Sequence, residues 1–187
     1  MSTGPKRPEF SLKDLELIAA CRKAAPAIIT KHLSAPINQI SGYNRTEIAF
    51  ALLMMAHDFL CQYLSPEKAQ ETFDTMAFFA KRKDSAIFPR LGAPLRASPE
   101  ELRRRIEPGE KSAREILARY FGGVGPQILA AGRNRTEAAY ALSVLAYDAL
   151  CQVNNAEHAE LIFDALTPYS QEHIEQWRKK TLLLRLN

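Results

Sequence analysis

The sequence lacks any apolar run long enough to cross a membrane. Its longest run of apolar residues, Ile48 to Ala56, falls well short of the ~18–20 residues that a membrane-spanning helix needs. The opening residues, MSTGPKRPEF, lack the apolar segment of a signal peptide. The three cysteines are an odd number without metal-ligand spacing, which indicates reduced thiols rather than a disulfide framework. We therefore expect a soluble, cytoplasmic protein with no membrane partner.

Motifs that would indicate a reaction are also missing. None of the four histidines lies in a His-x-x-x-His or His-Glu-x-x-His motif, and the lack of any Glu-x-x-His argues against a carboxylate-rich di-metal bundle. Gly122, Gly123 and Gly125 lack the Lys-Ser/Thr ending of a phosphate-binding loop and are better explained as the end of a helix. The sequence therefore gives no catalytic residue, no metal site and no cofactor site, and an enzyme is the less favoured class.

Strand patterns are absent as well. No segment alternates apolar and polar residues with enrichment in β-branched side chains, so we predict an all-α protein. Pro26 predicts a kink or break near Ala25, residues 34–43 are predicted to form a loop, and the helix after that loop should end near Leu64. Capping residues and prolines predict helices that begin after Ser11, Asn44, Ser65, Ser98, Asn134, Asn155 and Pro168, and one more after Ser112.

One stretch of the sequence occurs twice. Residues 44–62, NRTEIAFALLMMAHDFLCQ, and residues 134–152, NRTEAAYALSVLAYDALCQ, agree at a shift of 90 positions. The agreement continues into the following helix, and a weaker similarity upstream matches residues 28–33 with 116–121 at a shift of 88. We interpret this as an internal duplication. The predicted fold is an internally duplicated helical bundle, in which two repeats of three to four helices are related by a pseudo-two-fold axis.

The duplication also divides the chain. We predict a flexible N-terminal tail over 1–10, a first helical repeat over 11–80, a basic connecting segment over 81–97, and a second repeat with a C-terminal helix over 98–187. A duplication of this kind is typical of a fused two-fold symmetric dimer, in which both subunits used the same surface patch as the interface.

The residues that are identical in the two core helices fall on two arcs of a helical wheel. The first arc mixes small and large apolar side chains, a pattern that lets a neighbouring helix approach closely. It holds Ala49, Leu52, Ala56 and Leu60 in the first copy, and Ala139, Leu142, Ala146 and Leu150 in the second. We expect the two core helices to lie at the centre of the molecule and to meet along this arc.

The second arc carries the polar identities. Asn44 and Asn134 are predicted N-caps, and an acidic side chain three residues later completes each capping box. Asp58 and Asp148 follow long apolar stretches; they are interpreted as structural carboxylates, with a ligand-binding or catalytic role as the less favoured alternative. The identical residues of this arc are Glu47, Ala51, Asp58, Cys61 and Gln62, with Glu137, Ala141, Asp148, Cys151 and Gln152 in the second copy.

The connection between the copies is basic. Residues 81–119 carry 11 basic and 6 acidic side chains, a net charge of +5, whereas the flanking parts have net charges of 0 and −1. Such cations are candidates for contacts with nucleic-acid phosphates, although an ordinary solvated surface is the favoured explanation. The candidate contacts are Lys81, Arg82, Lys83, Arg90, Arg103, Arg104 and Arg105.

Fold and charge together favour a non-enzymatic interaction protein, an adaptor or regulator that binds another protein. The alternative is a nucleic-acid-binding regulator that uses residues 81–105. A third interpretation is a small-ligand or metal-binding enzyme that uses Asp58 and Asp148. Self-association into a homo-oligomer is compatible with all three.

Overall fold

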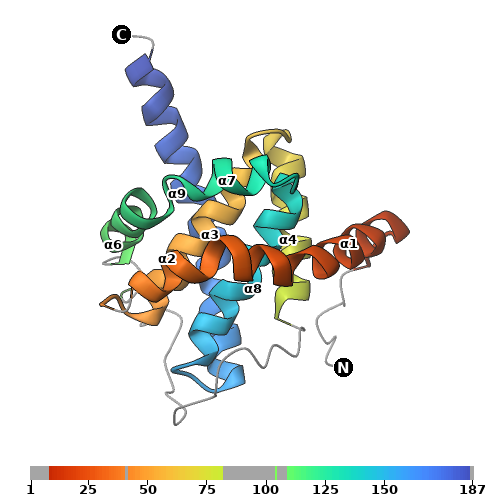
Figure 1. Cartoon of the computed structure of the whole chain (residues 1–187), viewed down its shortest axis with the longest axis horizontal. Coiled ribbons are helices and arrows are strands. Elements are labelled where there is room, and N and C mark those ends of the chain that lie inside the picture. Colours follow the sequence, from red (N-terminus) through yellow and green to blue (C-terminus); the bar gives the residue numbers. More distant parts are fainter. Residues whose placement is uncertain (1–8, 41, 82–103, 105–108, 186–187) are drawn as a thin grey trace, which may run out of the picture.

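The computed structural model describes residues 9–40, 42–81, 104 and 109–185, and this part of the chain contains helices but no strand, as predicted (Figure 1). The helices of the first half are α1 (Leu12–Ile28), η1 (Ile29–Leu33), α2 (Ser34–Gln39), α3 (Arg45–Cys61) and α4 (Pro66–Ala80). Those of the second half are α6 (Gly109–Ile116), η2 (Leu117–Phe121), α7 (Val124–Ala130), α8 (Arg135–Cys151) and α9 (Ala156–Arg185). The segments η1 and η2 are π-helical.

The helices α3 and α8 lie at the centre and pack against each other, as the sequence predicted. Both are apolar nearly all round, which suits a helix that is covered on every side. Each begins at the predicted capping box. The Glu47 amide donates to Asn44 Oδ1 at 2.9 Å and the Glu137 amide donates to Asn134 Oδ1 at 2.8 Å, while each glutamate accepts from the asparagine amide in return.

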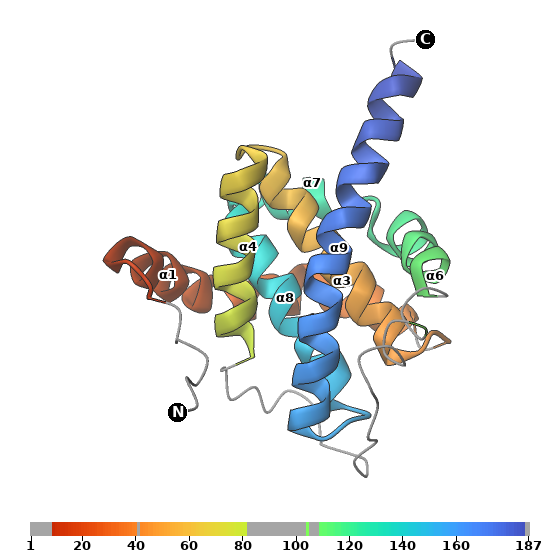
Figure 2. The ribbon, with the colours of Figure 1, turned by 180° about the vertical axis from the view of Figure 1, so that it is seen from behind.

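The outer helices cover the central pair from the opposite half of the chain. α1 and α4 pack on α8, whereas α6 and α9 pack on α3 (Figures 1 and 2). The two helices that follow the central ones also contact their own half, α4 on α3 and α9 on α8. Each central helix is therefore enclosed only when both halves of the chain are present.

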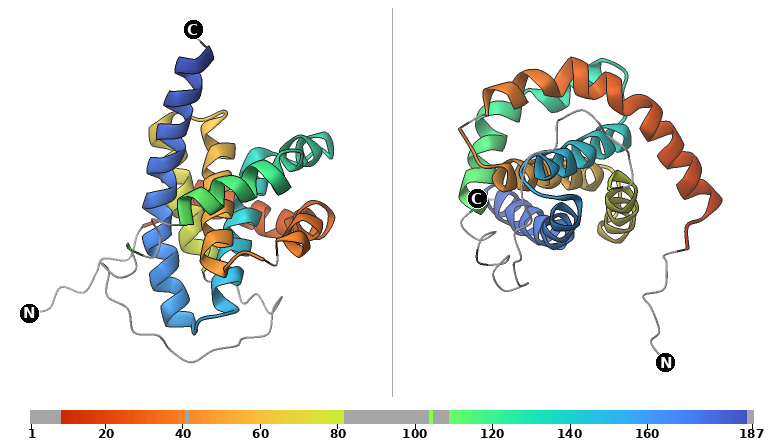
Figure 3. Two further views of the ribbon diagram at one scale, coloured as in Figure 1. Left: turned by 90° about the vertical axis from the view of Figure 1, so that its left-hand side faces the viewer. Right: turned by 90° about the horizontal axis from the view of Figure 1, so that it is seen from below.

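The two π-helical segments lie within curved arms of the structure. One arm consists of α1, η1 and α2, which bend around the outside of the central pair; the other consists of α6, η2 and α7 (Figure 3). The arms meet, because α7 contacts η1 and α2 contacts η2. The predicted break near Ala25 is wrong: α1 continues through Pro26, and the helix widens to the π form three residues later.

Four predicted boundaries need correction, and two of them involve proline. Residues 34–39 are helical rather than part of a loop, because Pro36 lies in the first turn of α2, where a missing amide costs little. Ser112 lies inside α6, which begins at Gly109, so it is not an N-cap. The helix after Asn155 does not stop at Pro168; α9 runs through it. α3 ends at Cys61, one turn before the predicted Leu64.

The predicted domain boundaries lie largely outside the described residues. Of the predicted tail over 1–10, only residues 9 and 10 are described, and the Phe10 ring packs 4.8 Å from the rings of Phe78 and Phe79. Of the predicted connecting segment over 81–97, only Lys81 is described, and of the region between it and α6 only Arg104. The predicted short helix after Ser98 falls outside the described residues apart from Arg104.

Candidate functional site

A groove of about 500 Å³ separates part of α3 from the arm that contains η2. α3 forms one wall, and α6, η2 and α7 form the other. Ten of its thirteen lining residues are apolar or glycine, so its interior favours an apolar occupant. The lining residues are Met54, Met55, Asp58, Phe59, Gln62, Arg114, Leu117, Ala118, Phe121, Gly122, Gly125, Pro126 and Leu129.

The α3 wall is set by helical spacing. Met54 and Met55 lie one turn before Phe59, so the three side chains share the face of α3 that looks toward η2. Met54 and Phe59 are buried, whereas Met55 is half-buried. Methionine side chains are unbranched and adapt to irregular shapes, which suits a wall that accommodates a ligand.

The opposite wall is open because its residues are small. Ala118, Gly122 and Gly125 follow one another along η2 and α7. A Cβ atom at Gly125 would lie 3.2 Å from Phe59 Cζ, so the missing side chain lets α7 approach that ring closely. The positions 88 residues earlier hold Thr30, Ser34 and Ile37 in the first arm. The side chains at these three positions are therefore smaller in the second arm than in the first.

Asp58 is the acidic residue of the groove, and a chain of hydrogen bonds holds it. Gln62 Nε2 donates to Asp58 Oδ2 at 2.8 Å, and Arg135 Nε donates to Gln62 Oε1 at 3.1 Å. Arg135 belongs to the first turn of α8, and beside it Tyr63 and Thr136 form a hydrogen bond through their hydroxyls. Residues from both halves of the chain thus position the carboxylate.

The counterpart of Asp58 has a different setting. Asp148 is only 3% exposed, whereas Asp58 is half-buried and lines the groove. Arg114 brings a positive charge to the lining from α6. Of the two aspartates that the sequence singled out, one is in an accessible site and the other is enclosed.

The cysteines of the core helices are half-buried at the ends of α3 and α8. Cys61 Sγ lies 3.5 Å from His57 Nε2, one turn back on the same helix. His57 stacks on Phe73 with ring centroids 5.2 Å apart, and the aromatic pair at the matching positions, Tyr147 and Phe163, is 5.5 Å apart. His57 and its counterpart Tyr147 differ between the copies, but each packs between its central helix and the helix that follows it.

Among the cations predicted to contact nucleic acid, Lys81 forms ion pairs within the molecule. Its side chain is only 10% exposed, and Nζ lies 2.5 Å from Asp164 Oδ1 and 3.3 Å from Glu160 Oε1 on α9. Lys81 Nζ is thus paired within the molecule, and its predicted phosphate contact stays a prediction. Arg104 is exposed. The remaining candidates, Arg82, Lys83, Arg90, Arg103 and Arg105, lie outside the described residues.

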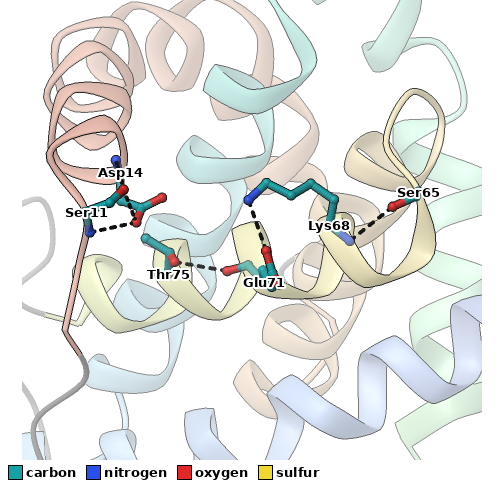
Figure 4. Close-up of polar contacts among 6 residues, drawn as sticks. All are labelled: Ser11, Asp14, Ser65, Lys68, Glu71 and Thr75. Atoms are coloured by element: carbon teal, nitrogen blue, oxygen red, sulfur yellow. Dashed lines mark hydrogen bonds and ion pairs between the residues drawn. The ribbon is translucent and has the colours of Figure 1, made fainter.

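A second hollow, of about 380 Å³, lies between the start of α1 and α4, and most of its lining residues are polar or charged. Several of its polar groups bond within their own helices (Figure 4). Lys68 Nζ pairs with Glu71 at 3.0 Å, and the Lys68 amide donates to the N-cap Ser65 at 3.3 Å. Ser11 and Asp14 form the capping box of α1. Burial raises the pKa of Asp74 at the rim of this hollow, although a hydrogen bond from Gln171 acts in the opposite direction.

No group of three or more His, Cys, Asp or Glu side chains in the described part of the chain is arranged to hold a metal ion. Within those same residues, no helix combines the length and the apolar character that crossing a bilayer requires.

Sequence reasoning identified Asp58 and Gln62 but missed the other wall of the groove. Arg114, Leu117 and Phe121 were not singled out, and Gly125 was interpreted only as part of a helix stop. The available signal was the loss of side-chain bulk between the two arms, but it becomes meaningful only once η2 is known to face α3. Comparison with protein-family models, curated proteins and solved structures finds no match to this chain.

Proposed function

We propose that this protein binds a small, mainly apolar ligand in the groove between α3 and the arm formed by α6, η2 and α7. The observation that carries the proposal is the groove itself. Its volume of about 500 Å³ falls within the range of roughly 300–1,000 Å³ typical of small-molecule sites. Such sites have mostly apolar walls with a few polar groups that orient the ligand, and Asp58, Gln62 and Arg114 fit that role here.

The backbone of the groove supports the same proposal. π-helical segments cost regular hydrogen bonding, and in proteins they occur frequently at functional sites. Here η2 contributes Leu117, Ala118 and Phe121 to the lining. The segment η2 is followed at once by α7, whose Gly125 approaches Phe59 of α3.

Binding of another protein, the leading expectation from the sequence, stays a prediction. A stable protein interface needs roughly 800 Å² on each partner and an apolar centre. Among the described residues, the large apolar side chains that are exposed come from four separate elements: Leu12 and Leu15 of α1, Tyr63 after α3, Val153 after α8, and Leu161 of α9. This distribution favours a small ligand in the groove over a broad docking face. Nucleic-acid binding through residues 81–105 also stays a prediction.

We also propose that the chain is an internal duplication whose halves are related by a pseudo-two-fold axis. The matching helix bounds support this: α3 and α8 have the same length and begin 90 positions apart, and η1 and η2 have the same length and begin 88 apart. The reciprocal packing of the arms and outer helices on the central pair supports it further. If the halves are duplicates, their backbones match, and the groove distinguishes them through its side chains alone.

Ligand binding in the groove is tested with a neutral fluorescent probe, N-phenyl-1-naphthylamine, whose emission rises in apolar surroundings. We expect the wild-type protein to bind the probe and Ala118→Phe to lose most of that binding, because the added ring would fill the groove. Thr30→Phe is the matched control, since Thr30 is the second residue of η1 and is exposed, as Ala118 is in η2. Equal binding by all three proteins would refute the groove as the site.

A further inference from the structure

We infer that the ligand of the groove is a planar aromatic compound rather than an alkyl chain or a saturated ring. The inference rests on the proposed function, because it names the chemical class of the ligand for the same groove. Two features of the lining support it: sulfur and aromatic side chains on both walls, and a stretch of wall with almost no side chains.

The sulfur and aromatic side chains of the lining come from both sides of the groove. Met54, Met55 and Phe59 belong to α3, whereas Phe121 is the last residue of η2 on the other wall. A thioether sulfur makes favourable contacts with the edge of an aromatic ring, and two aromatic rings attract each other in tilted or offset-stacked arrangements. An aromatic ligand between these walls gains both kinds of contact, whereas an alkyl chain gains only the general benefit of leaving water.

The matching positions in the other half of the chain hold only aliphatic side chains. All four of those side chains are buried, so packing at such positions does not itself require sulfur or an aromatic ring. Every sulfur-containing or aromatic residue of the lining is therefore a difference between the copies, which favours a role in ligand recognition over a role in folding. The matched pairs are Met54 and Val144, Met55 and Leu145, Phe59 and Ala149, and Phe121 and Leu33.

The wall formed by η2 and α7 offers a surface on which a ring can lie flat. Ala118, Gly122 and Gly125 line the groove there, so backbone and one methyl group form the surface at these positions. A planar ring placed against such a surface touches it with most of its atoms, and dispersion attraction adds up over those contacts. A saturated ring is thicker and puckered, so fewer of its atoms reach the backbone. The missing side chains thus favour a flat ligand.

The methionines let the opposite wall adjust to such a ring. A methionine side chain is unbranched and has three rotatable bonds, so it can follow the outline of a ligand. Met55 is half-buried and Met54 is buried beside it, which places one adaptable side chain at the surface of the groove and one below it. The volume of about 500 Å³ is large enough for a fused two-ring system.

The test compares 1-naphthol with its saturated analogue, decahydro-1-naphthol, as competitors that displace N-phenyl-1-naphthylamine from the full chain at pH 7. Both compounds are uncharged and share the carbon skeleton and the hydroxyl group, so they differ in aromaticity and planarity. Emission of the probe is excited beyond the absorption band of 1-naphthol. We expect 1-naphthol to displace the probe at an about tenfold lower concentration, because only its rings make the sulfur and aromatic contacts.

Exchanging groove residues for their counterparts tests which side chains are responsible. Met55→Leu nearly keeps the side-chain volume, and Phe121→Leu removes a ring; each introduces the residue found at the matching position of the other half. Both variants should lose most of the preference for 1-naphthol, while decahydro-1-naphthol competes as in the wild type. Met76→Leu is the matched control, because Met76 is buried in α4 outside the lining and also has leucine at its matching position. It should keep the preference.

The outcomes separate this inference from the proposed function. If the wild type binds no probe, or Ala118→Phe leaves probe binding unchanged, both the groove and the aromatic ligand are refuted. If the probe binds in the groove but decahydro-1-naphthol competes as well as 1-naphthol, only the aromatic class is refuted. The same conclusion holds if Met55→Leu and Phe121→Leu both keep the preference, or if Met76→Leu loses it as they do. Loss of the preference in either groove variant, with the control unchanged, supports the inference.

Discussion

Gln171 of α9 donates a hydrogen bond from Nε2 to Asp74 Oδ1 of α4 at 3.3 Å, across 97 positions of the chain. The residues at the matching positions, 90 apart in the sequence, also contact each other: Lys81, directly after α4, donates to Asp164 of α9 at 2.5 Å. The first pair joins a neutral amide to a carboxyl group, whereas the second is an ion pair that also includes Glu160. Matching positions of the two copies thus form two contacts between α9 and the α4 region, one with a neutral donor and one with a charged donor.

This difference predicts unequal effects of substitutions at Lys81. Lys81→Met should lower the free energy of unfolding by roughly 1–2 kcal/mol, because it leaves two acidic side chains without their partner. Lys81→Gln should lose less, because glutamine can donate to Asp164 as Gln171 does to Asp74. Urea unfolding at low and high salt measures both effects. Lys68→Met, which removes an exposed pair with Glu71, is the control and should change little. Equal losses for all three variants would contradict the prediction.

The contact between the central helices predicts that added volume is destabilising there. Ala56 and Ala146 are fully buried in α3 and α8. Replacing either alanine by leucine should lower the free energy of unfolding by roughly 1–3 kcal/mol, since the packed neighbours must move. Ala20→Leu, at an exposed position of α1, is the control and should unfold like the wild type. A buried variant as stable as the control would show that this packing is loose.

The reciprocal covering of α3 and α8 predicts that the halves depend on each other. Two fragments, residues 1–94 and 95–187, separate the two halves without cutting any described helix. Each half alone should lack a cooperative unfolding transition as a monomer, because the helices that cover its central helix are in the other half. Mixing the halves should restore the transition, measured by circular dichroism against urea. A single half that is monomeric and unfolds cooperatively would refute the proposed pseudo-dimer.

The raised pKa of Asp74 predicts the direction of a pH effect. Burial raises this pKa above its ordinary value of 3.8, so the folded state binds the proton more tightly than the unfolded state. The contribution of Asp74 to stability is therefore most favourable below 3.8 and is lost as the pH rises through the folded-state pKa. Asp74→Asn should then be at least as stable as the wild type at pH 7, with an advantage that disappears in acid.

The position matched to Asp74 supplies the control for this pH effect. Asp164→Asn should be less stable than the wild type at pH 7, because it weakens the ion pair with Lys81. Thermal unfolding of the two variants across pH 3–7 measures the contrast. If Asp74→Asn were clearly destabilised at pH 7, the hydrogen bond from Gln171 would outweigh the cost of burying the charge.

Prediction from sequence succeeded where short-range chemistry determines structure. The caps at Asn44, Ser65, Asn134 and Asn155 are all confirmed, since each side chain accepts from the amide three residues on. Prolines misled the prediction, because packing overrides their local preference. Pro168 removes one amide from α9, yet the helix continues over the surface of α3, and Thr167 and Ser170 donate side-chain hydrogen bonds to nearby carbonyls.

The groove could be predicted only in part. Asp58 was identified because the same residue recurs in the second copy. Its accessibility depends on which helix faces it, and that is set by long-range packing: α6 and η2 pack on α3 rather than on α8. The approach of Gly125 to Phe59 joins positions far apart in the chain, and periodicity along one helix carries no information about such a contact.

The exchange of covering helices between the halves also sets the order in which a newly made chain can mature. Arg22 of α1 donates to the Tyr140 hydroxyl of α8, 118 positions later. A ribosome therefore releases α1, α3 and α4 well before it has made the helix on which α1 and α4 pack. Domains generally fold as units during synthesis, and contacts over long sequence separations form late. The first half then exposes apolar surface until the second half has been synthesised. During that time it is the part of the nascent chain that is accessible to chaperones and proteases.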